Sequence, residues 1–160
     1  MNKNCGFVAG TLVHTDNGLV PIEQIKVGDI VFSRHESGSG ELAYKRVTQT
    51  FLTENQLIWA MEISGKIKNS DIFKEEFLFT TSNHLFWTFE NVSSDAIDVS
   101  SGKWKSVLDL EMGSPLLRYD GEFAGIFDLL PLYQTTEPNK AFYKVYPDYS
   151  AGDIFRCKCL

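Results

Sequence analysis

Short runs of β-branched and aromatic residues alternate with polar residues along most of the chain, and Gly, Asn and Asp separate the runs. Helix signals are scarce, so the pattern is typical of an all-β domain. The opening region is the clearest example: residues 11–15 are predicted as a strand, Asp16-Asn17-Gly18 as a tight turn and residues 19–22 as the returning strand. We therefore expect a fold built from β-hairpins.

The same pattern extends to the rest of the chain. A single short helical turn is predicted over residues 21–25, and residues 64–71 are predicted to be a polar connection between strands. Residues 105–110 fit a helix and a strand equally well. The other predicted strands cover residues 30–33, 44–52, 57–63, 77–81, 85–89, 116–119, 122–132 and 141–146.

Length and composition indicate one globular domain over residues 1–160. The chain has 160 residues, of which 43% are hydrophobic and 22% charged. A chain of this length buries roughly two-thirds of its unfolded surface, which is enough for one core. We find no internal repeat and no Pro/Gly-rich linker that would divide it.

Charge and hydropathy exclude several partners. The formal net charge is −6, whereas proteins that bind nucleic acid concentrate Lys and Arg to displace counterions from phosphates. No apolar run reaches the 18 or so residues that a membrane span requires, and the first ten residues lack the apolar stretch of a signal peptide. We expect a soluble monomer that binds neither nucleic acid nor membrane.

The cysteines predict neither a disulfide framework nor a metal site. A bridge between Cys157 and Cys159 would be strained, because a single residue separates them. A tetrahedral zinc site needs four ligands, and the histidines lack paired spacing. These residues are Cys5, Cys157 and Cys159, and His14, His35 and His84.

The chain does contain two motifs that point to one family. Residues 5–31 read CGFVAGTLVHTDNGLVPIEQIKVGDIV. This resembles the amino-terminal signature of Hint domains, found in inteins, Hedgehog autoprocessing domains and bacterial toxin precursors: a nucleophile, an apolar residue, a segment ending in Gly-Thr, a hairpin and an IExIxxGDxV run. Thr81-Ser82-Asn83-His84 is similar to the family's TxxH element. The sequence of the first motif is most similar to the pre-toxin Hint domains of bacterial polymorphic toxins.

The resemblance implies a fold and a chemistry. The fold is an all-β horseshoe of curved hairpins with at most one or two short helical turns. The family's first Cys attacks the carbonyl of the preceding peptide bond and turns an amide into a thioester, an N-to-S acyl shift that another nucleophile resolves. Carried over, the proton donor to the leaving nitrogen is His84, and Thr81 binds or distorts the scissile peptide. No metal or organic cofactor is required.

The nucleophile departs from the family pattern. The family's Cys stands immediately before the apolar residue that here is Phe7, and Gly6 occupies that position. Because successive strand residues face opposite sides, this slip would turn the Cys5 sulfur away from His84 unless a β-bulge absorbs the extra residue. Three alternatives stay open: a bulged working nucleophile that cuts the Asn4–Cys5 bond, a site that has lost its thiol, or a Gly6 introduced to trap an uncleaved form.

The carboxyl end also departs from the pattern. Splicing members end in His-Asn before a nucleophile, and residues 156–160 contain neither His nor Asn. Carboxyl-terminal cleavage and splicing are therefore not expected. In the horseshoe of this fold the two ends converge, so a disulfide between Cys5 and either Cys157 or Cys159 becomes feasible.

Two functions follow. The first is autoprocessing with Cys5 or the Gly6 position as nucleophile site, Thr81 and His84 as its partners and the chain's own flanking polypeptide as substrate. The second is a non-catalytic Hint scaffold that acts as a spacer or docking domain. In both, the context that the resemblance implies is a bacterial secreted precursor with a fused toxin module.

Overall fold

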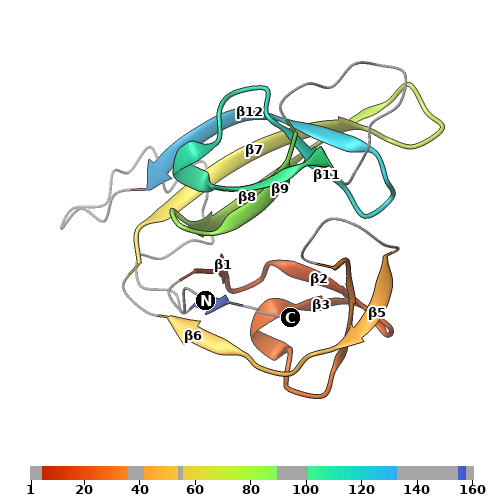
Figure 1. Ribbon diagram of the computed structural model, residues 1–160, viewed down its shortest axis with the longest axis vertical. Helices are drawn as coiled ribbons and strands as arrows, with labels where there is room; N and C mark the ends of the chain where they lie inside the picture. Colours follow the sequence, from red (N-terminus) through yellow and green to blue (C-terminus); the bar gives the residue numbers. More distant parts are fainter. Residues whose placement is uncertain (1–4, 36–41, 54–55, 90–100, 133–154, 158–160) are drawn as a thin grey trace.

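The computed structural model describes residues 5–35, 42–53, 56–89, 101–132 and 155–157, and this part of the chain is built almost entirely from β-strands (Figure 1). In it, the fully described helical segments are two turns of 3-10 helix, η1 (Ile22–Gln24) and η3 (Val107–Asp109). The all-β fold with short helical turns is thereby confirmed. The strands are β1 (Phe7–Val8), β2 (Leu12–Thr15), β3 (Gly18–Pro21), β4 (Ile30–Ser33), β5 (Ala43–Arg46), β6 (Phe51–Thr53), β7 (Ile58–Lys66), β8 (Phe73–Thr81), β9 (Leu85–Thr88), β10 (Lys103–Ser106), β11 (Pro115–Leu117), β12 (Phe123–Leu132) and β13 (Phe155–Cys157).

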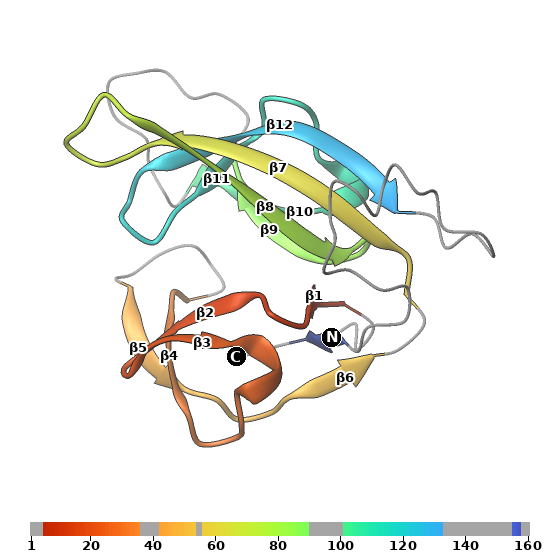
Figure 2. The same ribbon diagram turned by 180° about the vertical axis from the view of Figure 1, so that it is seen from behind.

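The strands form two sheets. The larger has nine strands in the order β10-β9-β11-β12-β7-β8-β1-β13-β6, and the smaller has four in the order β3-β2-β4-β5. Figures 1 and 2 show the consequence from two sides: the large sheet begins in one lobe, curls through β1 and β13, and ends at β6 beside the small sheet. This curl is the horseshoe that the resemblance implied.

The small sheet is organised by the first motif. Its hairpin turns at Asp16-Asn17, because Thr15 pairs with Gly18, which has a φ of 91° that an L side chain rarely adopts. The hairpin was thus predicted correctly, but its second strand starts one residue earlier than expected. The core of the small sheet consists of Ile25, which follows η1, Val31 on β4 and Val47, which follows β5.

Two carboxylates of the same motif hold backbone amides. The Gly10 N–H donates to Glu23 Oε2 at 2.7 Å, which ties the chain before β2 to η1. The Lys26 N–H donates to Asp29 Oδ2 at 2.8 Å and closes the turn at Gly28. These acidic residues are therefore parts of the fold rather than acids of a reaction.

The large sheet is organised by the long hairpin of β7 and β8, which pair from Ile58–Thr81 to Lys66–Phe73. Strand β12 pairs along the other edge of β7, with a bulge between Ile126 and Asp128. One face packs the core of Met61, Leu110, Leu116 and Ile126, and the other face packs Val8, Ala60 and Phe79. Both faces of this sheet thus carry apolar clusters.

One predicted strand was wrong. Residues 44–52 form two strands in different sheets, β5 and β6, instead of one. The reason lies at Val47, which is fully buried. Its N–H donates to Asp29 O and its carbonyl accepts from Gly28 N, so the chain is fixed in the small core before it crosses to the large sheet.

Other boundaries shifted because pairing extends strands into polar residues. β7 continues to Lys66 and β8 starts at Phe73, so the predicted connection at 64–71 shrinks to residues 67–72. Residues 105–110 divide between the end of β10 and η3. The predicted strand at 141–146 lies outside the described residues.

The carboxyl-terminal strand lies beside the amino-terminal one. β13 pairs antiparallel with β1, Phe7 opposite Arg156, and on its other side with β6. The convergence of the ends is confirmed for the backbone, as the two views show (Figures 1 and 2). The side chains of Cys157 and Cys159 lie outside the described residues, so their pairing with Cys5 stays a prediction.

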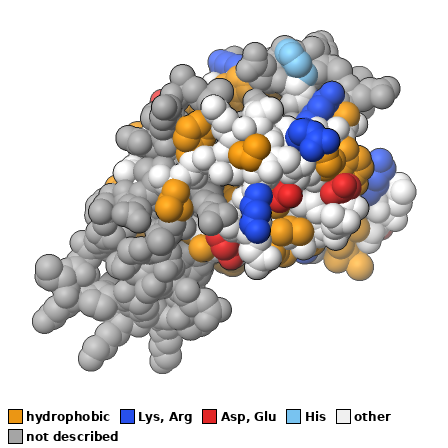
Figure 3. Space-filling model, turned by 90° about the horizontal axis from the view of Figure 1, so that it is seen from below, with side chains coloured by type: hydrophobic (Ala, Val, Ile, Leu, Met, Phe, Trp, Pro, Cys, Tyr) orange, Lys and Arg blue, Asp and Glu red, His pale blue; other side chains and the backbone are white. Residues whose placement is uncertain are grey.

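Within the described residues, no helix has the length and apolar character needed to cross a membrane. On the face of the molecule shown in Figure 3, acidic, basic and single hydrophobic side chains lie interspersed.

Candidate active site

The backbone of Gly6 is held from both of its polar atoms where β1 meets β8. The Gly6 N–H donates to Thr81 Oγ1 at 3.0 Å, and the Thr81 N–H donates back to Gly6 O at 3.0 Å. The Thr80 hydroxyl donates to the same carbonyl at 2.8 Å. Both threonines are buried, at 0% and 1% exposure, so these bonds are shielded from water. We call this arrangement the threonine clamp.

The turn after β8 explains why the Thr81 side chain, and not its backbone carbonyl, accepts the hydrogen bond from Gly6 N–H. In an antiparallel pair the carbonyl of Thr81 would accept from Gly6 N. That carbonyl instead accepts from His84 N at 3.2 Å, which closes the Thr-Ser-Asn-His turn. The Thr81 hydroxyl takes over as acceptor, so the TxxH spacing both builds the turn and frees the hydroxyl for Gly6.

The imidazole of His84 lies against aromatic rings beside the clamp. Its centroid is 4.3 Å from that of Phe7 and 5.1 Å from that of Phe86. Its Nδ1 is buried and has no hydrogen-bond partner among the described residues. Burial lowers the pKa of His84 from 6.5 to about 4, because an imidazolium would lose its hydration there. At neutral pH this side chain is therefore uncharged and can accept a proton.

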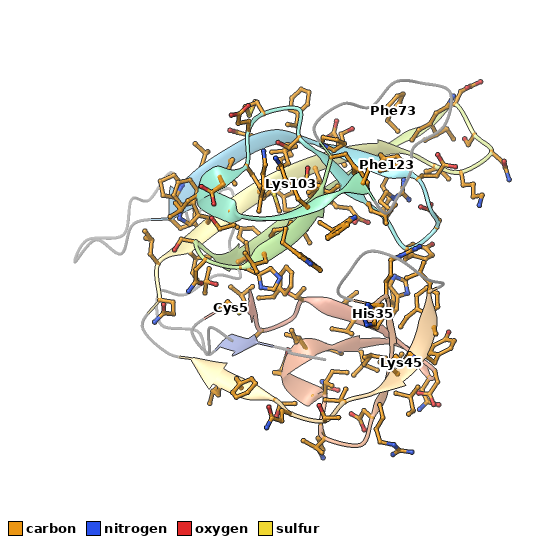
Figure 4. All side chains as sticks on the ribbon, viewed as in Figure 1. Cys5, His35, Lys45, Phe73, Lys103 and Phe123 are labelled. Carbon is orange, nitrogen blue, oxygen red and sulfur yellow. The ribbon has the colours of Figure 1, made fainter. Side chains whose placement is uncertain are left out.

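Cys5 lies two residues before β1 begins and is bonded directly to the clamped Gly6. Figure 4 labels it there, in the lobe of the small sheet and facing the lobe that holds β8 and β9. Its side chain is half-buried. The structure thus brings Gly6 and Thr81 into contact, with Cys5 one residue before Gly6 and His84 on the turn after Thr81, and the catalytic roles of these residues stay predictions.

The other histidines lie away from this neighbourhood. His14 and His35 are exposed, as expected for surface residues, and the ring of His14 packs on Tyr119 with centroids 4.4 Å apart. In the described ranges, no three His, Cys, Asp or Glu side chains come close enough to hold a metal ion.

Sequence reasoning missed two residues, one in the clamp and one paired with it in the sheet. Thr80 lies outside the TxxH element, and its only signal was that a second Thr directly precedes Thr81. Trp59 was assigned to the core by its aromatic character. It pairs with Thr80 across β7 and β8, and its indole Nε1 is buried without a partner in the described structure.

This geometry suits the cutting of a peptide bond. A clamp fixes one stretch of backbone, a thiol lies at the neighbouring residue, and a neutral imidazole with an open nitrogen lies on the adjoining turn. Backbone fixation, a nucleophile and a proton acceptor are three of the parts that acyl transfer uses.

Comparison with known proteins yields the same fold. The model of the pretoxin HINT domain family matches residues 12–151. This span includes Thr81 and His84 but begins after Cys5 and Gly6, so it does not extend to the nucleophile position. No curated protein matches the chain.

Several solved structures resemble it. A bacterial intein-like domain from Clostridium thermocellum has a TM-score of 0.65 at 22% identity, over 96% of this chain and 84% of that one. An Ssp DnaB mini-intein variant has a TM-score of 0.62 at 12% identity, over 99% and 85%. The gp41-1 intein has a TM-score of 0.55 at 16% identity, over 98% and 89%. At these identities the likeness establishes the fold.

Proposed function

The chain belongs to the pretoxin Hint domain family, and from this membership we propose that it is an autoprocessing domain that cuts its own backbone at its amino-terminal junction. The observation that carries the proposal is the threonine clamp on Gly6, with Cys5 immediately before the clamped residue and the neutral His84 on the turn that follows Thr81. The scissile bond is Asn4–Cys5.

The reaction follows from the residues in order. The Cys5 thiol gives its proton to the imidazole of His84, and its sulfur attacks the carbonyl carbon of Asn4. The bond between that carbon and the Cys5 nitrogen breaks as the nitrogen takes the proton back from His84. The product is a thioester on Cys5 with a free amine, and water or an added thiol then releases the leading polypeptide.

Backbone geometry supports Cys5 as the nucleophile. Gly6 directs both its N–H and its carbonyl toward Thr81, as an extended residue does. Side chains two positions apart on extended backbone lie on the same side, which puts Cys5 on the side of Phe7. The Phe7 ring touches His84. The extra residue therefore does not by itself turn the sulfur away from the histidine.

The clamp supplies the positioning. Because the amide and carbonyl of Gly6 are both bonded to β8, the peptide unit that follows Cys5 is fixed relative to the His84 turn. A fixed reactant needs less ordering on the way to the transition state, which is a large part of intramolecular rate acceleration.

The test is a fusion with a reporter protein ahead of Asn4. We expect time-dependent release of the reporter, accelerated by dithiothreitol and absent from Cys5→Ala. The matched control replaces Cys157 and Cys159 together by Ala, which keeps Cys5 as the one thiol and should still cleave. An intact wild-type fusion after long incubation with thiol would contradict the proposal.

A companion variant addresses the Gly6 position. The alternative function, a scaffold without catalysis, is favoured by the absence of any side chain at the clamped residue. If Gly6→Cys cleaves and the wild-type fusion does not, the thiol has been lost and the rest of the site is preserved. If neither cleaves, the scaffold function is the one that stands.

The flanking context is part of the proposal. The polypeptide ahead of Asn4 is the substrate, and a fused toxin module is the setting that the family name supports. A bacterial secreted precursor is the further context that we propose.

A further inference from the structure

Three buried polar atoms without partners belong to residues on the turn after Thr81 or on the strand that pairs with β8. They are the Nδ1 of His84, the Oδ1 of Asn83 and the Nε1 of Trp59, each unbonded within the described part of the chain. Buried polar groups in folded proteins almost always have a partner, because an unmet donor or acceptor costs free energy. An unpaired donor or acceptor on the elements of a site is a place where a substrate group can supply the missing partner.

The strand register places Trp59 on the same face of the sheet as the site. Trp59 is paired with Thr80, and Thr80 with Phe7, across three adjacent strands. Side chains of paired residues lie on one face of a sheet. This face carries Phe7, whose ring contacts His84.

The packing of neighbouring residues supports this assignment. Met61 lies two residues after Trp59 on β7 and therefore shares its face. Met61 belongs to the cluster against which Phe86 packs, and the ring of Phe86 lies 5.1 Å from that of His84. The indole of Trp59 thus lies on the face of the sheet where Phe7 contacts the histidine, and its N–H is shielded from solvent.

The unmet atoms differ in kind. His84 offers an acceptor for a proton and Trp59 offers a donor, and a donor is what the proposed reaction lacks. When the sulfur attacks, the carbonyl oxygen of the scissile bond becomes negatively charged and needs a hydrogen bond that is already in position. The hydroxyls of Thr80 and Thr81 are committed to Gly6 and do not supply it.

We propose that Trp59 is a further catalytic residue, whose indole N–H donates to the scissile carbonyl oxygen as it becomes an oxyanion. This inference rests on the proposed cleavage.

The first test removes the N–H and keeps the ring. In the reporter fusion, Trp59 is replaced by Phe and, in a second protein, by benzothienylalanine, an isostere of tryptophan with sulfur in place of the N–H. Loss of one oxyanion donor typically lowers a rate by about 100-fold or more, and we expect a loss of this order in both. Trp104→Phe is the matched control, since Trp104 on the edge strand β10 packs on Trp87 of the neighbouring β9.

The isostere separates catalysis from structure. It should unfold at the same temperature as the wild-type chain while it cleaves slowly. Cleavage at the wild-type rate by the isostere overturns the proposal.

A second test does not depend on cleavage. The three tryptophans give three indole N–H signals by NMR, which Trp→Phe variants assign. The Trp59 signal is compared between Cys5→Ala with the leading polypeptide attached and a chain that begins at residue 5. We expect a downfield shift when the acyl carbonyl is present. An unchanged signal overturns the role of Trp59 even if the fusion cleaves, and a shift in a fusion that never cleaves contradicts the proposed function alone.

Discussion

At the scale of single residues, the site depends on side chains that replace backbone partners. The Thr81 hydroxyl accepts the bond that the Thr81 carbonyl would accept in an ordinary pair, because that carbonyl closes the turn to His84. Removing the hydroxyl would therefore leave the Gly6 N–H buried without an acceptor.

We expect Thr81→Val to lower the free energy of unfolding by about 1–3 kcal/mol and to abolish cleavage. Urea titration measures the first effect and reporter release the second. The matched control is Thr88→Val, since Thr88 is also buried and its hydroxyl donates to Pro115 O outside the site. Thr88→Val should lose stability and still cleave, and equal loss of cleavage in both variants would contradict a specific role for Thr81.

The pKa of His84 makes stability depend on pH in a defined window. The folded chain holds this pKa at about 4 and the unfolded chain at 6.5, so between these values the unfolded state binds the extra proton. Through His84, the free energy of unfolding is therefore highest above about pH 6.5 and falls by up to about 3 kcal/mol as the pH falls toward 4.

His84→Gln should remove this part of the pH dependence, whereas His35→Gln, at an exposed site, should keep it. The measurement is the free energy of unfolding by urea at pH 7.5, 6, 5 and 4.5. Parallel curves for His84→Gln and the wild-type chain would show that His84 is not buried in its neutral form.

The residues of the site were only partly predictable. Thr81 and His84 stand in a motif whose spacing has a mechanical reason, since four residues close the turn. Thr80 and Trp59 have no such spacing signal. Their place beside Gly6 depends on the register between β1, β7 and β8, which comes from segments up to 75 residues apart.

At the scale of elements, patterning predicted hairpins well and failed where the chain changes sheets. Residues 44–52 alternate like one strand, and only the bonds of Val47 with the turn at Gly28 reveal that the chain leaves the small sheet there. Polar residues at the ends of β7 and β8 likewise belong to strands because a long partner pairs with them.

Close packing between β7 and β12 can be tested at a glycine. A Cβ at Gly65 would lie 2.8 Å from the Phe123 carbonyl oxygen, whereas a Cβ at Gly125 would meet nothing within 4 Å. We expect Gly65→Ala to lower the free energy of unfolding by about 1–3 kcal/mol. Gly125→Ala, on the facing strand, should change it by less than about 1 kcal/mol. Equal effects in thermal or urea unfolding would contradict the close approach of the two strands.

At the scale of the whole molecule, the curl of the large sheet brings both ends of the chain to one place. β1 is only two residues long and lies between β8 and β13, so the position of Cys5 depends on the last strand. Sequence reasoning reached this convergence through the family resemblance, since no local pattern pairs residue 7 with residue 156.

Removal of residues 155–160 should therefore loosen the site and leave the β7–β8 hairpin intact. We expect faster amide hydrogen exchange in peptides covering residues 5–11 and 51–53, unchanged exchange in residues 58–66, and loss of cleavage. Removal of residues 158–160 alone is the control. Unchanged exchange in residues 5–11 after the longer deletion would mean that β13 does not hold β1.

The central claim, that this Hint domain uses Cys5 to cut the Asn4–Cys5 bond, is tested most directly by the intact mass of the fusion after incubation with hydroxylamine. We expect two fragments: a leading polypeptide that ends in the hydroxamate of Asn4 and a domain that begins at Cys5, neither of them formed by Cys5→Ala. A cut at Asn17–Gly18 is disregarded, because hydroxylamine cleaves Asn–Gly bonds without a thioester. A fusion of unchanged mass, or one that is cut at other bonds but not at Asn4–Cys5, would contradict the claim.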